Sequence, residues 1–290
     1  MSSQPLVSVV IVNWNKKEDL RACLESVKAQ TYKNIEIIVV DNHSTDGSIE
    51  LIREDFTEVK LIVMPDPSYG ACETFNIGFA NATGTYVVVM DNDATLEERW
   101  IEAAITKFDT EDAKIALIAP KVLHQASGKL QWPPKQYEKC EHYVDSFLGC
   151  GVIVKKFVLA EVGGYPKRFF IYTNESDLAI KILNRGYKIL YFPQITTFHK
   201  GMQEEIYSMS PRQFYYSFSN ELWVTWKYYP FKKLLFFTLF RLYLFTKLSV
   251  KKRYFALFFK SIFRAILGIP YCIRERAPCY AEELNNWRRK

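Results

Sequence analysis

The sequence YVVVMDND at residues 86–93 decides the fold. Residues 86–90 are continuously apolar and rich in valine, which is typical of a strand buried on both faces of a parallel sheet. Similar runs occur at residues 7–12 (VSVVIV) and 35–40 (IEIIVV). Between these two runs, apolar residues recur at the spacing of an amphipathic helix. The alternation of strands and helices predicts a doubly wound α/β sheet, which binds ligands at the carboxyl ends of its strands.

Asp91 and Asp93 follow the apolar run directly, at the edge of the sheet where ligands bind. Two carboxylates at this spacing can both offer oxygen ligands to a hard divalent cation, which takes further ligands from water or a phosphate-bearing substrate. An isolated pair of this kind is more often a solvated turn. Because Asp41 ends a second strand at the same edge, we interpret the pair as a metal and phosphate site.

Three further polar groups are candidates for function. Residues 41–47 (DNHSTDG) combine a strand-end carboxylate, which can accept from a nucleobase or ribose, with a helix N-terminus that favours anions. An ordinary capped turn is the alternative there. Glu175 and Asp177 lie in the sequence NESD, where a carboxylate can act as a general base or merely cap a helix. His199 follows the last apolar strand and is either a metal or phosphate ligand or a surface or core histidine.

Seven segments occur in a characteristic order: VSVVIVNWN (7–15), DNHSTDG (41–47), G-x5-N-x-G (70–78), ATGTYVVVMDND (82–93), FLGCGVIV (147–154), GGYPKRFFIY (163–172) and FHKG (198–201). Over about residues 5–205 this ordered set resembles glycosyltransferase family 2, and its rhamnosyltransferase-like members in style. Each motif alone is common, and their order makes the resemblance specific.

The resemblance implies a GT-A fold, in which helices flank a mixed, mostly parallel sheet, and an inverting, metal-dependent transfer of a sugar from a nucleoside diphosphate donor. Carried over by position, the donor-binding residues are Asn13, Asn15, Asp41, Asp46, Asn76 and Asp91. A divalent cation, Mg²⁺ or Mn²⁺, would be held by Asp93, Asp91 and His199. The family commonly has Glu-Asp-x-Asp where this sequence has Asn-Glu-Ser-Asp, so Glu175 is the expected base and Asp177 the second candidate.

The charge of the chain is unevenly distributed. The formal net charge is +6, yet residues 227–272 contain ten basic residues and no acidic one, and residues 1–226 carry a net charge of −6. The basic segment also holds 14 of the 45 aromatic residues. Its apolar runs are too short and too charged to span a bilayer.

Amphipathic helices are expected in this basic segment. Arg253, Lys260 and Arg264 share one helical face among aromatic residues, which predicts helices lying in a membrane interface with their cations toward anionic lipid. Packing on the catalytic domain or on a second subunit of a homo-oligomer is the alternative. Nucleic-acid binding is disfavoured because the sequence contains no recognised nucleic-acid module.

We therefore expect a GT-A catalytic domain at residues 1–210, with a nucleotide-sugar half at about 1–95 and an acceptor half at about 96–210. A C-terminal helical segment for membrane or oligomer contacts is expected at residues 211–290. The expected acceptor is a lipid-linked glycan in cell-surface polysaccharide or glycoconjugate assembly, with the enzyme peripheral at the cytoplasmic face of the cell membrane.

Other features of the sequence agree with this interpretation. No signal peptide is evident at the N-terminus, and six scattered cysteines without a C-x-x-C pair are typical of reduced thiols. A nucleotidyltransferase is disfavoured, since Asn13-Trp14-Asn15 is not a glycine- and lysine-rich phosphate loop. A non-catalytic nucleotide- or glycan-binding partner subunit of the same fold stays as the alternative function.

Overall fold

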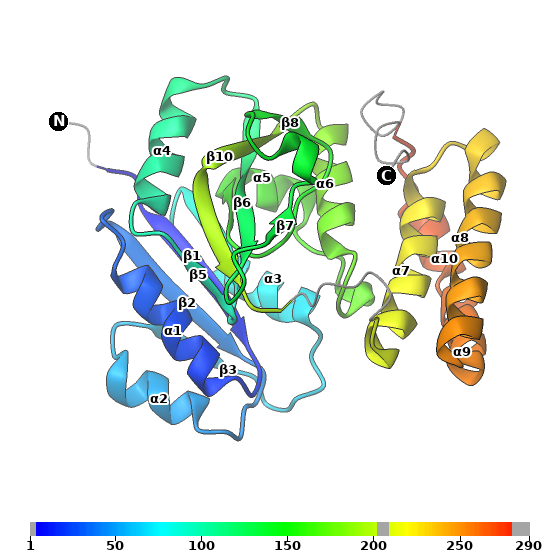
Figure 1. Ribbon diagram of the computed structural model, residues 1–290, viewed down its shortest axis with the longest axis horizontal. Helices are drawn as coiled ribbons and strands as arrows, with labels where there is room; N and C mark the ends of the chain where they lie inside the picture. Colours follow the sequence, from blue (N-terminus) through cyan, green and yellow to red (C-terminus); the bar gives the residue numbers. More distant parts are fainter. Residues whose placement is uncertain (1–3, 202–208, 280–290) are drawn as a thin grey trace.

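A mixed sheet forms the centre of the protein (Figure 1). The computed structural model describes residues 4–201 and 209–279, and within them ten strands share one sheet in the order β3-β2-β1-β4-β9-β6-β10-β5, with β7 on β6 and β8 on β10. The strands are β1 (Val7–Asn13), β2 (Ile35–Asp41), β3 (Lys60–Val63), β4 (Tyr86–Asp91), β5 (Ala94–Leu96), β6 (Ile115–His124), β7 (Leu130–Trp132), β8 (His142–Val144), β9 (Val152–Lys155) and β10 (Lys188–His199).

The parallel part of the sheet confirms the doubly wound α/β expectation. Strand β1 pairs in parallel with β2 and with β4, and the three apolar runs are buried as predicted. The registers place Asn13 beside Asp41 and Val12 beside Asp91. Polar residues from separate parts of the sequence therefore meet at one edge of the sheet.

Two layers of helices cover the sheet. One apolar cluster joins it to α1 (Lys17–Lys28), α2 (Ser48–Asp55) and α4 (Trp100–Thr110). The other joins it to α3 (Ala71–Asn81), α5 (Lys156–Val162) and α6 (Asn174–Asn184). Short 3-10 turns, η1 (Lys135–Tyr137) and η2 (Lys167–Phe169), lie in the connections. Helix α1 buries Leu20, Cys23, Leu24 and Val27, the residues whose helical spacing predicts this face.

The C-terminal segment is helical, and its first helix is part of the main core. It comprises α7 (Pro211–Tyr228), α8 (Phe231–Lys252), α9 (Phe255–Leu267) and α10 (Ile269–Arg274). Trp223, Val224 and Tyr228 of α7 belong to the same apolar cluster as α3, α5 and α6. The expected boundary at residues 210 and 211 thus coincides with the start of α7, while the packing unites α7 with the preceding body.

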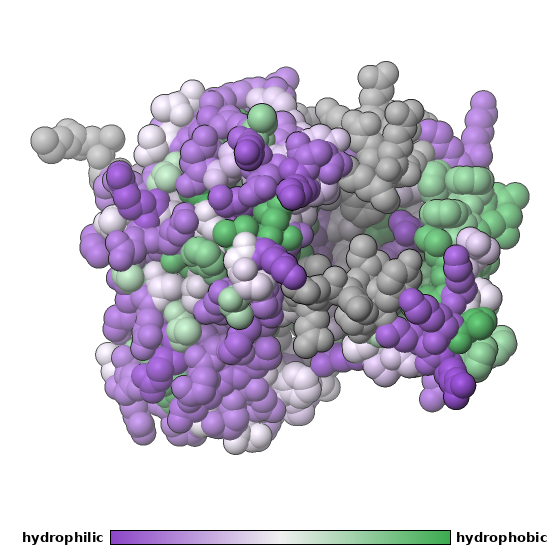
Figure 2. All heavy atoms as spheres, in the orientation of Figure 1, coloured by the Kyte–Doolittle hydropathy of each residue, from purple (hydrophilic) through white to green (hydrophobic). Residues whose placement is uncertain are grey.

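Helices α8 and α9 form an outer layer on α7. Phe214 and Phe218 of α7 pack with Phe245 of α8 and Ala265 of α9. Figure 2 shows apolar side chains gathered over these outer helices, in contrast to the polar surface of the body. Within residues 4–201 and 209–279, no helix is long and apolar enough to cross a membrane.

Candidate functional site

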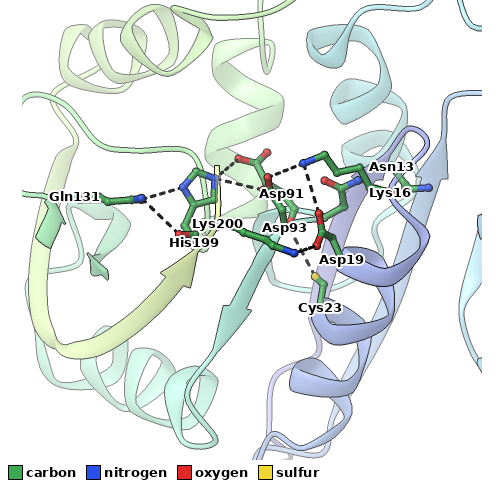
Figure 3. A network of polar contacts seen from close by, with 10 residues as sticks. Asn13, Lys16, Asp19, Cys23, Asp91, Asp93, Gln131, His199 and Lys200 are labelled. Carbon is green, nitrogen blue, oxygen red and sulfur yellow. Dashed lines mark hydrogen bonds and ion pairs between the residues drawn. The ribbon is translucent and has the colours of Figure 1, made fainter. Parts of the chain in front are cut away.

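Asp91, Asp93 and His199 form a cluster at the carboxyl ends of β4 and β10 (Figure 3). One ligand atom from each residue lies within 4.8 Å of the other two. His199 Nε2 is 3.3 Å from Asp93 Oδ1 and 3.9 Å from Asp91 Oδ2. Two carboxylates and an imidazole are a suitable donor set for a divalent cation such as Mn²⁺.

Antiparallel pairing brings His199 to the aspartates. Strand β5 runs beside the end of β10, and Ala94 is the register partner of His199. Because Asp93 directly precedes Ala94, this pairing brings together residues that are more than one hundred positions apart in the sequence. The three residues expected to hold a cation are thus together in space.

Gly201 leaves room beside this cluster. A Cβ atom at Gly201 would lie 2.9 Å from Asp93 Oδ2 and 3.0 Å from His199 Nε2. Any larger residue would crowd both ligand atoms, whereas glycine keeps that side open. The residues present therefore fit a divalent cation in chemistry and in space.

Gln131 orients the imidazole ring. His199 Nδ1 lies 3.0 Å from Gln131 Oε1, so that Nδ1–H donates to the amide and Nε2 faces the carboxylates. Burial lowers the pKa of His199, but the hydrogen bonds with Asp93 and Cys150 together raise it to about 11. The ring is therefore protonated in this arrangement, and binding of a cation to Nε2 would release that proton.

Lys16 is a member of the site that the sequence analysis missed. Its Nζ lies 3.1 Å from Asp93 Oδ2 and 3.5 Å from Asp19 Oδ2. Burial raises the pKa of Asp93, but His199 and Lys16 outweigh it and bring the pKa to about 2, so the carboxylate is ionised. The signal was available, because Lys16 follows the end of β1 at the same edge as Asp91.

Glu175 lines a cavity that also contains the cluster of Asp91, Asp93 and His199. It occupies the first turn of α6, and its Oε1 would lie 2.5 Å from a Cβ atom at Gly149, so only glycine fits there without a shift. Burial raises the pKa of Glu175 to about 7, and the negative charge of Asp91 contributes to the rise. A carboxylate with this pKa can take up a proton near neutral pH.

The loop that precedes α6 and Glu175 is held by α7. Tyr172 and Thr173 have φ values of 67° and 64°, a left-handed conformation that is unfavourable without tertiary support. Asn220 of α7 supplies that support: its Nδ2 donates to the carbonyls of Phe169, Ile171 and Tyr172 at 3.1, 2.8 and 2.9 Å.

Asp177 has different surroundings from Glu175. It is fully buried, and its carboxylate lies 2.5 Å from Lys227 Nζ, 2.8 Å from Lys181 Nζ and 2.7 Å from the Tyr228 hydroxyl. Burial raises the pKa of Asp177, but the opposing effect of Lys181 and Lys227 is larger, so the pKa is lowered overall. The carboxylate is therefore ionised and paired with these two lysines. Of the two candidates for the base, the geometry favours Glu175.

Asn13 and Asp41 form a buried pair behind Asn92, which lines the cavity. Both are fully buried, and Asn13 Nδ2 donates to Asp41 Oδ2 at 2.7 Å. Asp41 Oδ1 accepts from the backbone N–H of Ser44 at 2.7 Å. Asn92, which lines the cavity, donates to Asn13 Oδ1 at 2.6 Å. The pair supports Asn92, and because neither residue is among the described residues that line the cavity, its contact with a donor stays a prediction.

The other expected donor-binding residues brace loops. Asn15 Oδ1 accepts from Thr45 N, and Asp46 Oδ2 accepts from Lys17 N, both at 2.8 Å. Asn76 exchanges two hydrogen bonds of 2.8 Å with the backbone of Tyr165. None of these three side chains is among the described residues that line the cavity, so a donor role for them stays a prediction.

The cavity is large enough for an extended substrate, with a volume of about 1390 Å³. The body contributes the cluster of Asp91, Asp93 and His199, together with Glu175 and the segment from Trp132 to Pro134 at the end of β7. Helices α7 and α8 contribute Glu221, Phe237, Phe240 and Arg241. This contribution from the C-terminal helices was not expected from the sequence.

Comparisons with known proteins agree with this geometry. The family model described as "Glycosyl transferase family 2" matches residues 8–158, slightly more than half of the chain. The chain is 35% identical over 113 residues to "Glycosyltransferase GlyA" of Streptococcus pneumoniae, which covers 38% of the chain and 16% of that protein. It is 24% identical over 217 residues to "Glucosyl-dolichyl phosphate glucuronosyltransferase" of Haloferax volcanii, covering 67% and 69%. The matches to the first three curated relatives span only 16% to 38% of those proteins.

A solved structure shares the fold. It is the mannosyltransferase PcManGT of Pyrobaculum calidifontis, described in complex with GDP-Man and Mn²⁺. The TM-score is 0.60 at 20% identity, over 77% of this chain and 64% of that chain. The expected GT-A-like α/β fold, with helices on both faces of a mostly parallel mixed sheet, is therefore confirmed.

Proposed function

Because the chain belongs to glycosyl transferase family 2, we propose that it is an inverting glycosyltransferase that moves a sugar from a nucleoside diphosphate sugar to a hydroxyl group of a glycan. One observation carries the proposal: Glu175, with a pKa near 7, lines the same cavity as the cluster of Asp91, Asp93 and His199. A substrate bound in this cavity can therefore contact both a general base and a site suited to a divalent cation.

Glu175 acts as the general base in this proposal. Its carboxylate accepts the proton of the acceptor hydroxyl as that oxygen attacks the anomeric carbon of the donor. The bond from that carbon to the diphosphate breaks on the opposite side, and the configuration inverts. Asp91, Asp93 and His199 would hold Mg²⁺ or Mn²⁺, which offsets the negative charge on a departing diphosphate. Lys16 adds a positive charge at the same edge.

The proposed donor is a nucleoside diphosphate sugar, with dTDP-rhamnose or a UDP-sugar as the first candidates. The resemblance in sequence to rhamnosyltransferase-like proteins supports the first candidate. Two solved structures of similar fold support the wider class: PcManGT in complex with GDP-Man, and GalNAc-T7 with UDP and GalNAc.

We also propose a lipid-linked acceptor and a peripheral position at the cytoplasmic face of the membrane. A relative named for a glucosyl-dolichyl phosphate substrate supports a lipid-linked acceptor. The surface of the outer helices supports the position, since apolar side chains exposed on α8 and α9 include Phe231, Leu235, Phe236, Leu239, Phe240, Tyr243, Val250, Phe255, Phe259, Phe263 and Ile266. So many large apolar side chains exposed on two adjacent helices indicate an interaction site.

Cations around this apolar surface favour an anionic lipid surface as the partner. Lys232, Lys251 and Lys260 are exposed on the two helices, and no acidic residue lies between residues 227 and 272. Amphipathic helices with this composition bind at the boundary of headgroups and acyl chains. A second copy of the chain is the competing occupant, which measurement of the oligomeric state distinguishes.

One detail of the sequence interpretation is wrong. Arg264 does not share an outward face with Lys260, because its guanidinium points into the protein. It donates to Asn220 Oδ1 at 2.9 Å and to the carbonyl of Arg168 at 3.1 Å, and it also bonds Ser219. Burial lowers the pKa of Arg264 to about 10. This cation stabilises the junction of α9 with the body and is not available to lipid.

Donor hydrolysis tests the proposed function. The full chain with Mn²⁺ is incubated with UDP-, GDP- and dTDP-sugars without acceptor, and release of the nucleoside diphosphate is measured. We expect slow hydrolysis of one donor class, which disappears in Glu175→Gln protein. Absence of hydrolysis across the panel would instead support the non-catalytic nucleotide- or glycan-binding partner subunit.

A further inference from the structure

The C-terminal helices form one wall of the cavity that contains Glu175. Glu221 of α7 and Phe237, Phe240 and Arg241 of α8 belong to its lining. The three residues of α8 lie on one face of that helix, since they are spaced by three and four positions. A substrate in the cavity therefore contacts the helix whose outer face is proposed to lie on the membrane.

Arg241 supplies the positive charge of this wall. Its Nη1 lies 2.7 Å from Glu221 Oε2, and 23% of its side chain is exposed. Its Nε is buried and makes no hydrogen bond within residues 4–201 and 209–279. A guanidinium has five N–H donors, so one ion pair leaves capacity for a second anion.

Two lysines also line the cavity, and each of them has an acidic partner. Lys16 is held by Asp93, and Lys188 Nζ lies 2.8 Å from Asp112 Oδ2. Both come from the body of the protein. Arg241 is therefore the cation that an anionic group would meet on the side formed by the C-terminal helices.

An apolar path leads from Arg241 to the exposed surface. Phe240 lines the cavity, and 42% of its surface is exposed. It stacks on Phe236, with ring centroids 6.3 Å apart, and Phe236 belongs to the exposed apolar surface. On the inner side, Phe237 packs against Tyr229 with ring centroids 4.9 Å apart. The wall thus places a cationic group beside aromatic rings that lead to the exposed apolar side chains of α8.

We propose that Arg241 binds the phosphate or diphosphate that links the acceptor glycan to its lipid, and that Phe237 and Phe240 contact the adjoining part of the lipid chain. The planar guanidinium matches the geometry of a phosphate, and partial burial strengthens the attraction. This inference rests on the proposed function, because it places the acceptor in the transferase cavity. Arg241 is a binding residue in it and takes no part in the chemical step.

Binding of octyl phosphate tests the subsite. Calorimetric titration of the full chain below the micelle-forming concentration should show binding that neither inorganic phosphate nor 1-octanol reproduces, because each supplies only half of the ligand. The double variant Glu221→Gln/Arg241→Gln removes both charges and so leaves no unpaired ion. We expect it to bind octyl phosphate at least about tenfold more weakly.

Arg53→Gln is the matched control, since Arg53 is exposed on α2 and should leave binding unchanged. Equal affinity of the folded double variant and the wild type would overturn the proposal. Displacement of octyl phosphate by a nucleoside diphosphate would also overturn it, because the probe would then occupy the donor site. Donor hydrolysis by the wild type tests the proposed function separately. If hydrolysis is absent but octyl phosphate binding still depends on Arg241, the proposed function is contradicted and the phosphate subsite is supported.

Discussion

Lys227 Nζ lies 2.5 Å from Asp177 Oδ1 in the interior of the protein, and this ion pair joins α7 to the helix that carries Glu175. Both side chains are almost completely buried. Lys227 also lies 3.3 Å from the Tyr271 hydroxyl of α10. The C-terminal segment is thus tied to the candidate catalytic helix by charge as well as by apolar packing.

Lys227→Met should destabilise the protein. Removing one partner of a buried ion pair leaves a buried charge, and because Lys181 and Tyr228 still contact Asp177, we expect a loss near the lower end of the usual range, about 3 kcal/mol. Urea unfolding followed by circular dichroism measures the effect. Lys232→Met, at an exposed position of α8, is the control and should change stability little. Equal stabilities would show that the pair does not anchor α7.

Glu175→Gln should abolish most of the transfer while leaving donor affinity nearly intact. Loss of a general base costs about 10²- to 10⁴-fold in rate. Glu54→Gln, at an exposed position of α2, should retain full activity. If the transfer rate of Asp177→Asn protein fell in this way and that of Glu175→Gln protein did not, Asp177 would be the base instead.

The rate should also depend on pH through Glu175. A base must be deprotonated to act, and the pKa of Glu175 is about 7. The rate should therefore fall about tenfold per pH unit below pH 7 and become constant above it. Initial rates at saturating donor, measured from pH 5 to pH 9, test this profile. A rate that stays flat down to pH 5 would contradict Glu175 as the base.

Asp93→Asn should remove binding of Mn²⁺ and reduce transfer by at least about a hundredfold, because a cation that offsets leaving-group charge contributes several kcal/mol. Electron paramagnetic resonance of added Mn²⁺ measures binding independently of activity. Asp109→Asn, at an exposed position of α4, is the control. Full activity in the presence of EDTA would exclude the metal-dependent reaction.

The double variant Phe236→Ser/Phe259→Ser should bind anionic vesicles at least about tenfold more weakly, since each exposed ring contributes on the order of 1 kcal/mol or more when buried. Co-sedimentation with phosphatidylglycerol vesicles measures this, and high salt should weaken wild-type binding as well. Phe157→Ser removes another exposed ring, from α5 of the body, and should have no effect.

The same comparison distinguishes lipid from a second copy of the chain. If the wild type is dimeric in solution and the double variant is monomeric, with no vesicle binding in either, the apolar surface is a dimer interface. Point variants are preferable to truncation at residue 226 in this experiment, because that truncation would remove Lys227 and leave Asp177 without its partner.

The sheet and part of the site could be predicted from the sequence. Continuous apolar runs before Asn13, Asp41 and Asp91 require strands buried on both faces, and parallel strands bring their carboxyl ends to one edge. His199 could be placed at a strand end in the same way. Its approach to Asp93 depends on the antiparallel pairing of β5 with β10, for which the three residues of β5 carry no distinctive signal.

Only the tertiary structure separated residues whose local sequence looks alike. Glu175 and Asp177 share one helical turn, yet Glu175 lines a cavity whereas Asp177 meets Lys227 from a distant helix. Lys260 and Arg264 are four positions apart on one helix, yet Arg264 donates to backbone carbonyls of the body whereas Lys260 is exposed. The sequence alone determined which positions are apolar or charged and in what period. The tertiary structure decided which of those charges face water, substrate or another charge, because that depends on the surface that long-range packing brings against them.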